Sequence, residues 1–405
     1  MRVLYFHQHF TTPTGSGGTR SYEFARALVT QGHLVTMVCG RNASSVLDLP
    51  WDERRQWNRG EIDGIDVIAL PLAYSNRTSL LKRAGLFLRF AWRGIGLARK
   101  TETYDVLFAT STPLTAAIPG IVMKLLGGKK RFVFEVRDLW PELPRALGMK
   151  NPFLLGGMSL LEWLAYRYAD CCIGLSPGIV EGIRKRAPKG KSVEMIPNGC
   201  DLDLFQPRIR GPVELEGIKP RDFVAGFTGA HGIANGLDAV LDAAAELKRR
   251  GDTKIKIVLV GDGNQKDRMI KRADDEGLDN VRFYPPVKKT EIAKITASFD
   301  CGLMILADLP AFYYGTSPNK FFDYISSGIP VVNNYPGWLS DLITENQCGL
   351  AVPPGNPMAF ADTLERLVKD RALGKEMGRR GRAMAEREFS RSRLAEKFVS
   401  MITAR

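Results

Sequence analysis

The sequence has 405 residues, 44% of them apolar and 25% charged, and this length exceeds what one hydrophobic core usually serves, so it predicts two domains. Its net charge of +13 favours an anionic partner such as a phosphorylated ligand or an acidic membrane. No nucleic-acid-binding signature accompanies the charge, which excludes nucleic acid as an expected partner.

Short apolar runs alternate with helical stretches through the first half of the sequence. Residues 3–6 read as a buried strand, and a loop rich in Gly, Thr and Pro leads to an amphipathic helix over residues 19–31. Further apolar runs follow at residues 33–39, 65–70, 106–109, 132–135 and 172–175. This alternation predicts a parallel sheet with helices on both faces.

A second series of the same kind begins at residues 223–228, where a strand enters a glycine-containing turn and a long helix over residues 236–249. Apolar runs at residues 254–260, 281–283, 301–305 and 330–333 continue the series. Residues 205–222 contain three prolines and neither periodicity, so they form the predicted linker.

The two series predict an α/β fold of two Rossmann-like, doubly wound parallel-sheet domains that face each other across a cleft. We assign residues 1–207 to the first domain and residues 208–385 to the second, and we expect the helix in residues 386–405 to pack back on the first. Ligands of such sheets bind in loops beyond the carboxyl ends of the strands. The informative loops should therefore gather in the cleft.

The sequence shows no sign of export or of a membrane span. No run of about twenty uncharged apolar residues occurs, and the opening MRVLYFHQHF lacks the basic start and cleavage site of a signal peptide. The six cysteines lack metal-ligand spacing. We therefore expect a cytoplasmic protein with reduced thiols and no bound metal.

A glycine-rich loop follows the first strand of each series. TGSGGTR includes Gly17 and Gly18, and GFTGAHGIANG includes Gly229. Glycine lets the backbone approach a ligand closely, and N–H groups at a helix start can hold an anion. A tight turn without a ligand is the alternative for the first loop. In the GDGNQK loop after the next strand, Lys266 is either a cation for the same anion or an ordinary solvated lysine.

The EVRDLWPE loop, residues 135–142, follows a buried strand and gathers Arg137, Asp138 and Glu142 around Trp140. A carboxylate beside an indole can have a raised pKa that suits proton transfer. The alternative is a helix start with Asp138 as its N-cap.

The stretch TSPNKFFDYISSGIPVV, residues 316–332, combines small polar residues with a short helix. Lys320 and Asp323 lie three positions apart on that helix and share a face. A cation for phosphate and a carboxylate for a ribose hydroxyl would then point the same way. An exposed ion pair would have the same spacing.

Six segments carry a family resemblance over nearly the whole chain. They are GSGGTRSYEFARALVTQGH, VEMIPNGCDLDLF, FTGAHGIANGLD, GDGNQK, NVRFYPPV and NKFFDYISSGIPVV. In this order and spacing the chain resembles the family 4 glycosyltransferases of the GT-B fold. The GGTR start and the RDLWPE loop are most similar to those of bacterial enzymes that build O-antigen, capsule or exopolysaccharide.

The resemblance implies retaining transfer, without metal or cofactor, from a nucleotide sugar, usually a UDP-sugar. A lipid-linked saccharide is the implied acceptor, held by the first domain, and an N-acetylated amino or deoxyamino sugar is one candidate for the transferred group. Asp138 is the candidate for positioning or deprotonating the acceptor hydroxyl, although the departing phosphate is an alternative base. Gly17, Gly18, Arg137 and Glu142 are the other substrate-binding candidates of this domain.

The second domain binds the nucleotide in the family. By position, Gly229 would approach the pyrophosphate, Lys266 and Lys320 would neutralise it, and the backbone from Arg282 through Phe283 to residue 285 would frame the base. Asp323 matches the second acid of the family's E-x7-E motif, which binds the ribose, but the first acid is Gly315 here and the usual basic residue near Asn235 is missing. Three residues are therefore the candidate contacts for the donor sugar: Tyr314, Ser317 and Asn319.

Residues 79–100 contain six basic residues and no acidic one. On a helix one stripe would consist of Leu81, Ala84, Leu88, Trp92 and Ile95, with Arg89 and Arg93 beside it. Such a helix can lie at an anionic membrane surface, which predicts a peripheral protein on the cytoplasmic face. The alternative is a core helix with a solvated basic edge.

Two other functions remain open from the sequence. A sugar-nucleotide epimerase shares the fold and would act without an acceptor. A non-catalytic protein that binds an anionic polymer or lipid would explain the missing acid and the net charge.

Overall fold

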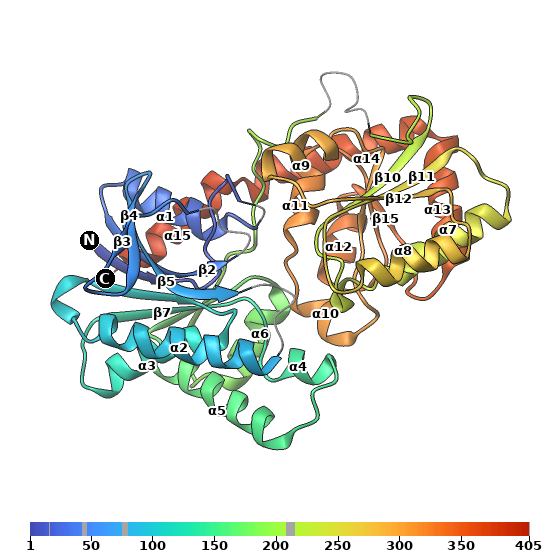
Figure 1. Ribbon diagram of the computed structural model, residues 1–405. Helices are drawn as coiled ribbons and strands as arrows, with labels where there is room; N and C mark the ends of the chain where they lie inside the picture. Colours follow the sequence, from blue (N-terminus) through green and yellow to red (C-terminus); the bar gives the residue numbers. More distant parts are fainter. Residues whose placement is uncertain (16, 43–46, 75–79, 208–214, 405) are drawn as a thin grey trace. The chain divides into compact units, whose positions relative to one another are not determined.

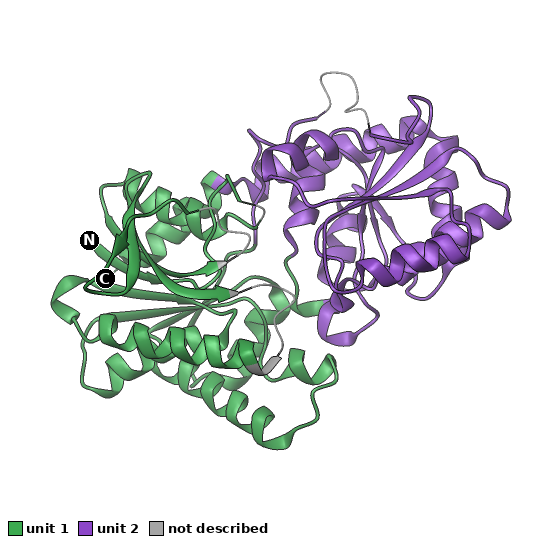
Figure 2. Cartoon of the chain, viewed as in Figure 1, with its two compact units in different colours: residues 1–197, 314–317, 392–405 green, residues 198–313, 318–391 purple. Residues whose placement is uncertain are grey.

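The computed structural model describes residues 1–15, 17–42, 47–74, 80–207 and 215–404 (Figure 1). The chain divides into two compact units (Figure 2). Unit 1 consists of residues 1–197, 314–317 and 392–405, and unit 2 of residues 198–313 and 318–391. None of the described helices is long and apolar enough to cross a bilayer.

Unit 1 is built on a nine-stranded sheet. Its strands are β1 (Arg2–Phe6), β2 (Leu34–Asn42), β3 (Trp51–Asp52), β4 (Trp57–Ile62), β5 (Ile65–Tyr74), β6 (Val106–Thr110), β7 (Arg131–Val136), β8 (Cys171–Gly174) and β9 (Ser192–Met195). They lie in the order β3-β4-β5-β2-β1-β6-β7-β8-β9, and all pairs are parallel except β3 with β4 and β4 with β5. Chain order reverses between β1 and β6, and a doubly wound sheet binds its ligand outside the carboxyl ends at such a point.

Helices cover both faces of this sheet. They are α1 (Arg20–Thr30), α2 (Leu80–Ala98), α3 (Ile118–Leu125), α4 (Glu142–Ala146), α5 (Pro152–Tyr168), α6 (Pro177–Arg186) and α15 (Arg391–Thr403). Successive residues of β1 enter different cores: Phe6 packs in the core that includes Phe90 of α2, and Tyr5 in the core that includes Phe398 of α15. Burial of both faces explains why β1 is apolar without alternation.

The last helix belongs to unit 1 although it follows unit 2 in sequence. The ring of Phe398 stacks on that of Phe24 of α1 with centroids 4.4 Å apart, and it meets the ring of Phe108 of β6 edge-on at 5.1 Å. Residues of α15 thus complete the core on the α1 side of the sheet.

Unit 2 contains a six-stranded parallel sheet in the order β12-β11-β10-β13-β14-β15. Its strands are β10 (Phe223–Thr228), β11 (Ile255–Val260), β12 (Val281–Tyr284), β13 (Cys301–Met304), β14 (Val331–Asn333) and β15 (Gly349–Ala351). Its helices are α7 (Asp238–Arg249), α8 (Lys266–Asp275), α9 (Lys289–Thr296), α10 (Pro310–Gly315), α11 (Asn319–Ser326), α12 (Trp338–Glu345), α13 (Pro357–Lys369) and α14 (Arg371–Met384). The order reverses between β10 and β13, which marks the expected ligand edge of this unit.

The predicted α/β fold of two doubly wound parallel sheets is confirmed. The antiparallel β3 and β4 were not expected, because their residues lack a clear apolar run. Unit 2 begins at Asn198, nine residues or so before the boundary expected at residue 207, since Cys200 N donates to Phe389 O at 2.7 Å and Arg391 N donates to Cys200 O at 2.9 Å. Residues 208–214 of the predicted linker lie outside the described residues.

Candidate active site

Two glycines bring the ends of β10 and β11 into backbone contact. Gly229 has φ 144° and Gly261 has φ 149°, a region that side-chain-bearing residues rarely adopt. A Cβ atom at Gly261 would lie 1.9 Å from Gly229 O, and one at Gly229 would lie 3.2 Å from the Cε atom of Lys320. Glycine is therefore required by the close packing of these loops, whether or not a ligand is present.

Lys320 lies against the Gly229 loop. Its Nζ donates to Asn235 Oδ1 at 2.7 Å and lies 4.0 Å from the ring centroid of Phe227. Burial lowers the pKa of Lys320 to about 7. The side chain thus supplies a cation beside Asn235, the position where the sequence lacks one.

The side chain of Lys266 donates hydrogen bonds to backbone carbonyl oxygens. Its Nζ donates to Gly261 O at 2.8 Å and to Tyr284 O at 2.9 Å, so it ties the ends of β11 and β12 together. Burial lowers the pKa of this lysine. A role toward an anion would require Lys266 to share its protons between these carbonyls and the ligand.

His231 is a buried residue of the same loops that the sequence analysis missed. Its ring lies 6.1 Å from that of Phe227 and 6.3 Å from that of Phe283, and neither ring nitrogen has a hydrogen-bond partner among the described residues. Burial, followed by the charge of Lys266, lowers the pKa of His231 to about 4. Because its backbone N donates to Asp262 O at 2.9 Å, this residue joins the two glycine loops.

Asp323 and Lys320 have different surroundings although both are in α11. Burial raises the pKa of Asp323 to about 6, against the charges of Lys289 and Arg391. Lys289 itself lies 3.3 Å from Asp201. Asp323 is thus part of a polar cluster of unit 2, whereas Lys320 contacts the Gly229 loop.

The other candidate donor contacts are distributed around α11 and β12, with Tyr314 and Ser317 in unit 1 and the rest in unit 2. Arg282 and Phe283 are half-buried in β12, the edge strand. Ser317 and Asn319 flank the start of α11 and are partly exposed. Tyr314 is exposed and belongs to unit 1, where its carbonyl oxygen accepts from Ser176 Oγ at 2.9 Å.

Unit 1 contains a buried ion pair between Arg20 of α1 and Glu135 near the carboxyl end of β7. Arg20 Nη2 lies 2.7 Å from Glu135 Oε2 and also donates to Ile196 O at 2.7 Å, while Thr110 Oγ1 donates to Glu135 Oε1 at 2.7 Å. Burial alone would raise the pKa of Glu135, but the charge and hydrogen bonds of Arg20 outweigh it and lower the pKa. The pair links α1, β6, β7 and the segment after β9.

Asp138 is half-buried and accepts a hydrogen bond from Thr112 Oγ1 at 3.2 Å. Burial raises its pKa, against the charge of Arg137 and the hydrogen bond from Thr112. The alternative in which Asp138 caps a helix is wrong, because α4 begins at Glu142 and its N-cap is Pro141. Asp138 therefore lies in a loop at the carboxyl ends of β6 and β7.

The neighbours of Asp138 are held by other elements. Arg137 N donates to Ser111 Oγ at 2.8 Å. Glu142 Oε1 lies 3.1 Å from Arg186 Nη1, so its carboxylate is paired with α6. Gly17 and Gly18 precede Thr19, the N-cap residue of α1, and Ser16 between Gly15 and Gly17 lies outside the described residues.

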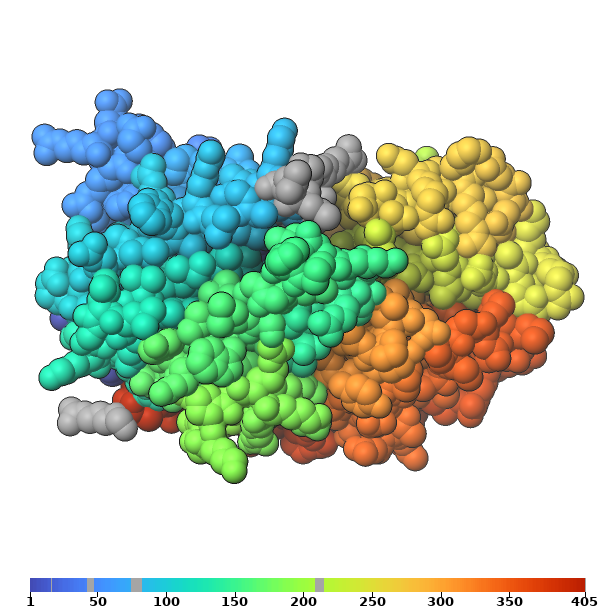
Figure 3. Space-filling model, turned by 90° about the horizontal axis from the view of Figure 1, so that it is seen from below, coloured from blue at the N-terminus to red at the C-terminus, as the bar shows by residue number. Residues whose placement is uncertain are grey.

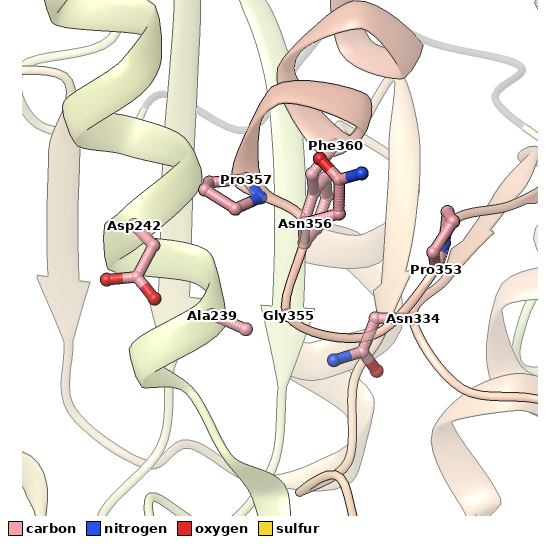
Figure 4. Close-up of a pocket in the computed structure, with 8 residues that line it drawn as sticks. All are labelled: Ala239, Asp242, Asn334, Pro353, Gly355, Asn356, Pro357 and Phe360. Atoms are coloured by element: carbon pink, nitrogen blue, oxygen red, sulfur yellow. The ribbon is translucent and has the colours of Figure 1, made fainter.

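A small hollow in unit 2 lies between α7 and the loop that leads into α13 (Figure 4). It is lined by Ala239, Asp242, Asn334, Pro353, Gly355, Asn356, Pro357 and Phe360. None of the candidate residues lines it. Within the described ranges, no group of three or more His, Cys, Asp and Glu side chains is arranged to hold a metal ion.

Two family models together match most of the chain. Residues 15–199 match the "Glycosyl transferase 4-like domain" and residues 214–384 match "Glycosyl transferases group 1". The chain belongs to the glycosyltransferases. The first match ends two residues after Pro197, where the first stretch of unit 1 ends, and the second match lies almost entirely in unit 2.

Solved structures resemble this glycosyltransferase over its whole length, and they confirm the GT-B fold. Sucrose-phosphate synthase from Thermosynechococcus elongatus has a TM-score of 0.76 at 18% identity and covers 99% of this chain and 98% of its own. Anabaena Alr3699/HepE in complex with UDP and glucose has a TM-score of 0.71 at 16% identity and covers both chains completely.

A curated relative is the D-inositol 3-phosphate glycosyltransferase of Paenarthrobacter aurescens (strain TC1), which is 30% identical over 204 residues. The match covers 48% of this chain, and the glycosyltransferase spans about half the length of that relative. The name of this relative specifies D-inositol 3-phosphate, whereas the acceptor expected from the sequence of this chain is a lipid-linked saccharide.

Proposed function

We propose that this glycosyltransferase moves a sugar, with retention of anomeric configuration, from a UDP-sugar to a lipid-linked saccharide in surface-polysaccharide synthesis. An N-acetylated amino or deoxyamino sugar is one candidate for the transferred group. The contact of Lys320 with the Gly229 loop carries the proposal, because it sets a cation at the ligand edge of the unit 2 sheet.

The donor would bind to unit 2 through its diphosphate. A phosphate would approach the backbone at Gly229, which has no side chain, and the ammonium of Lys320 lies beside it. Lys266 would add a second cation. The backbone at Arg282 and Phe283 would frame the base, and Asp323 would bind the ribose.

The chemistry requires negative charge to be stabilised on the leaving group. When the bond from the anomeric carbon to phosphate breaks, the sugar becomes oxocarbenium-like and the diphosphate gains charge. Fixed amide donors and a desolvated ammonium stabilise such charge without reorganising. In this proposal Lys320 and the loop amides take the part that a metal ion plays elsewhere, so a chelator should leave the rate unchanged.

The acceptor would bind to unit 1. Asp138 would position or deprotonate its hydroxyl, because a raised pKa makes a carboxylate a better base near neutral pH. Gly17, Gly18 and Arg137 are the proposed contacts of the acceptor. Glu142 would contribute only by leaving its ion pair with Arg186. The donor sugar would be held by Tyr314, Ser317 and Asn319.

Helix α2 supports a membrane-linked acceptor. Leu88 and Trp92 of the predicted stripe are exposed, and Arg89 and Arg93 beside them are exposed as well. The opposite side of the helix packs into unit 1 through Phe90. The side chain of Leu81 lies outside the described ones. We therefore propose peripheral attachment to the cytoplasmic membrane face through α2.

The test is a donor screen. Calorimetry and product analysis with UDP-, GDP- and dTDP-sugars should detect one donor that binds with micromolar affinity and that Lys320→Met binds at least about tenfold more weakly. Lys254→Met, which removes an exposed cation from the same unit, should bind like the unchanged enzyme. Absence of binding to every nucleotide sugar would contradict the proposal.

The acceptor requires its own experiment. Once a donor is found, incubation with the donor alone separates a transferase from an epimerase, because only the epimerase forms an isomeric nucleotide sugar without an acceptor. Lipid-linked saccharides and inositol phosphate should then be compared as acceptors. Transfer to inositol phosphate and not to the lipid-linked saccharides would contradict the proposed acceptor while leaving the donor site in place.

A further inference from the structure

The start of α5 exposes large apolar side chains to solvent. Phe153 is 88% exposed and Leu154 is 53% exposed, and Leu147 just before this helix is exposed as well. Leu160 and Trp163 continue the exposure farther along α5. Proteins bury most side chains of this size, and a gathering of exposed ones marks a surface that meets a partner.

The first turn of α5 is fixed by its cap. Asn151 Oδ1 accepts hydrogen bonds from Phe153 N at 3.0 Å and from Leu154 N at 3.2 Å. Pro152 at the first helical position adds to this rigidity. The two apolar side chains are thus presented by an ordered backbone, so binding through them would not require the helix start to fold first.

The exposed residues of α5 share a helical layer with those of α2. Helix α3 contacts both helices, so the three cover one face of the unit 1 sheet (Figure 1). Seen from below, the green segment around residues 145–165 lies at the centre of the view, beside the blue-to-cyan region that contains α2 (Figure 3). Trp92 of α2, 77% exposed, therefore adds to the same apolar layer.

The exposed charges between residues 143 and 169, the stretch that contains α5, are all positive. Arg145, Lys150 and Arg167 are exposed, and between residues 143 and 169 the sequence has one acid, Glu162. That acid is buried and accepts from Trp140 N at 2.9 Å and from Tyr166 Oη at 2.7 Å. Apolar side chains flanked by cations, with no exposed anion between residues 143 and 169, match a bilayer surface that contains anionic lipid.

Helix α5 is bonded to the loop that carries Asp138. The backbone N–H of Trp140 donates a hydrogen bond to Glu162 of α5, and Trp140 is two residues from Asp138. Arg186 reinforces the link, because its Nη1 lies 2.8 Å from Glu162 Oε2 and donates to Trp140 O at 2.9 Å. A helix that is seated on a membrane would thereby fix the position of the Asp138 loop relative to that membrane.

We propose that the start of α5, with Leu147, Phe153 and Leu154, inserts into the interface of an anionic bilayer and is the main membrane anchor of unit 1. Helix α2 then provides a second contact. The insertion holds the Asp138 loop at the lipid surface, where a lipid-linked acceptor presents its saccharide. This purpose rests on the proposed function, whereas the insertion itself does not.

Vesicle co-sedimentation tests the proposal with the double variant Phe153→Gln/Leu154→Gln. Both sites are exposed and Gln is a good helix former, so the fold should be retained. Partitioning onto phosphatidylcholine vesicles that contain phosphatidylglycerol should fall by about tenfold or more. The matched control is Met358→Gln, which alters an exposed apolar side chain on α13 of unit 2 and should partition like the unchanged protein.

Equal partitioning of the double variant and the unchanged protein would overturn the proposal, as would an unchanged protein that does not bind the vesicles. A dimer in ultracentrifugation that the double variant abolishes, without vesicle binding, would assign the surface to a second copy and would also overturn it. Calorimetry with UDP-sugar on the same samples separates the two proposals. Loss of vesicle binding by the double variant with unchanged donor affinity would support the membrane proposal independently of the donor site. Failure of the unchanged protein to bind any donor would contradict the proposed function and leave the membrane proposal standing.

Discussion

Thr112 holds Asp138 while its own backbone is strained. Its Oγ1 donates to Asp138 Oδ2 at 3.2 Å, and its φ of 82° is in a region that β-branched residues rarely adopt. Such a conformation costs about 1–3 kcal/mol and persists where surrounding structure requires it. Since Thr112 follows β6 at the ligand edge of the sheet, we infer that this conformation is retained because it aims the Thr112 hydroxyl at the candidate base.

Thr112→Gly separates the backbone strain at this position, which affects stability, from the hydrogen bond to Asp138, which affects turnover. Glycine adopts this φ without strain, and that gain should roughly offset the lost hydrogen bond and the added chain entropy, leaving unfolding free energy within about 1 kcal/mol of the original. Turnover should fall about tenfold because Asp138 loses its orienting partner. Denaturation and steady-state kinetics check both, and Thr112→Ser, which keeps the hydroxyl, should restore most of the turnover.

The same substitution should move the pH dependence. The hydrogen bond from Thr112 lowers the pKa of Asp138, against the larger effect of burial that raises it. Removal of the bond therefore raises the pKa further, and the acid limb of the rate profile should shift to higher pH in Thr112→Gly. A profile that keeps its position while turnover falls would show that Thr112 acts on structure alone.

Asp138→Asn tests the candidate base directly. The amide keeps the size of the carboxylate but cannot take a proton, so turnover should fall by about 10²–10⁴-fold. Donor affinity should not change, because Asp138 is not a proposed donor contact and the proposed contacts of the diphosphate, ribose and base are in unit 2. Calorimetry with the donor and initial rates give the two quantities. Turnover within about threefold of the unchanged enzyme would leave the departing phosphate as the base.

The sequence was sufficient to predict the two sheets and the glycine loops. Continuous apolar runs such as residues 223–228 predict buried parallel strands, and β10 has these bounds. Gly229 was predicted as a close-approach position, and its positive φ agrees with the conformational freedom that glycine provides. Lys320, whose side chain lies beside it, was predicted as a cation for phosphate from its place in residues 316–332, and the family resemblance assigned it to the pyrophosphate.

Other parts of the site depend on long-range contacts that no local pattern encodes. Arg20 and Glu135 are 115 positions apart, and the burial of their pair follows only from the sheet order. A charged residue inside the apolar run before RDLWPE was the available signal for Glu135. The left-handed backbone of Thr112 has no sequence signal, because β-branched residues are ordinarily excluded from it.

The buried pair should dominate the stability of unit 1. Glu135→Gln leaves the Arg20 guanidinium buried without its counterion, so unfolding free energy should fall by about 3–5 kcal/mol. Five of the six tryptophans, at 51, 57, 92, 140 and 163, lie in unit 1, so tryptophan fluorescence during urea unfolding reports mainly on this unit. Arg20→Met/Glu135→Leu should cost less than Glu135→Gln, since no unpaired charge remains.

This pair also predicts an acid dependence. Because Arg20 lowers the folded-state pKa of Glu135 below its unfolded value of about 4.3, the unfolded state binds more protons over this interval. The contribution of the pair is thus present above about pH 4.3 and is lost as pH falls through the folded-state pKa. Glu135→Gln should lack this pH-dependent stabilisation. Urea unfolding at pH 3.5, 4.5 and 6 should therefore show a smaller difference in unfolding free energy between the unchanged protein and Glu135→Gln at the lowest pH.

Lys320 should make donor binding depend on pH in the alkaline range, whereas the Arg20–Glu135 pair acts in the acid range. Burial lowers its pKa in the free protein to about 7, so a growing fraction of the side chain is neutral as pH rises. A diphosphate binds the ammonium form and must draw a proton back onto Lys320. The dissociation constant for UDP should therefore rise between pH 7.5 and 9, approaching tenfold per pH unit. The terminal phosphate of UDP titrates near pH 6 and lies outside this window.

Lys320→Met separates this effect from every other titrating group. The variant should bind UDP weakly and with the same dissociation constant from pH 7.5 to 9, while Lys254→Met should keep the full dependence. The stability of the unliganded protein should change in the direction opposite to UDP affinity. Between about pH 7 and 10.4 the unfolded chain binds the proton that Lys320 has released in the folded state. The unfolding free energy should therefore increase with pH in this window. UDP affinity that is independent of pH in the unchanged enzyme would show that the ammonium of Lys320 does not contact the diphosphate.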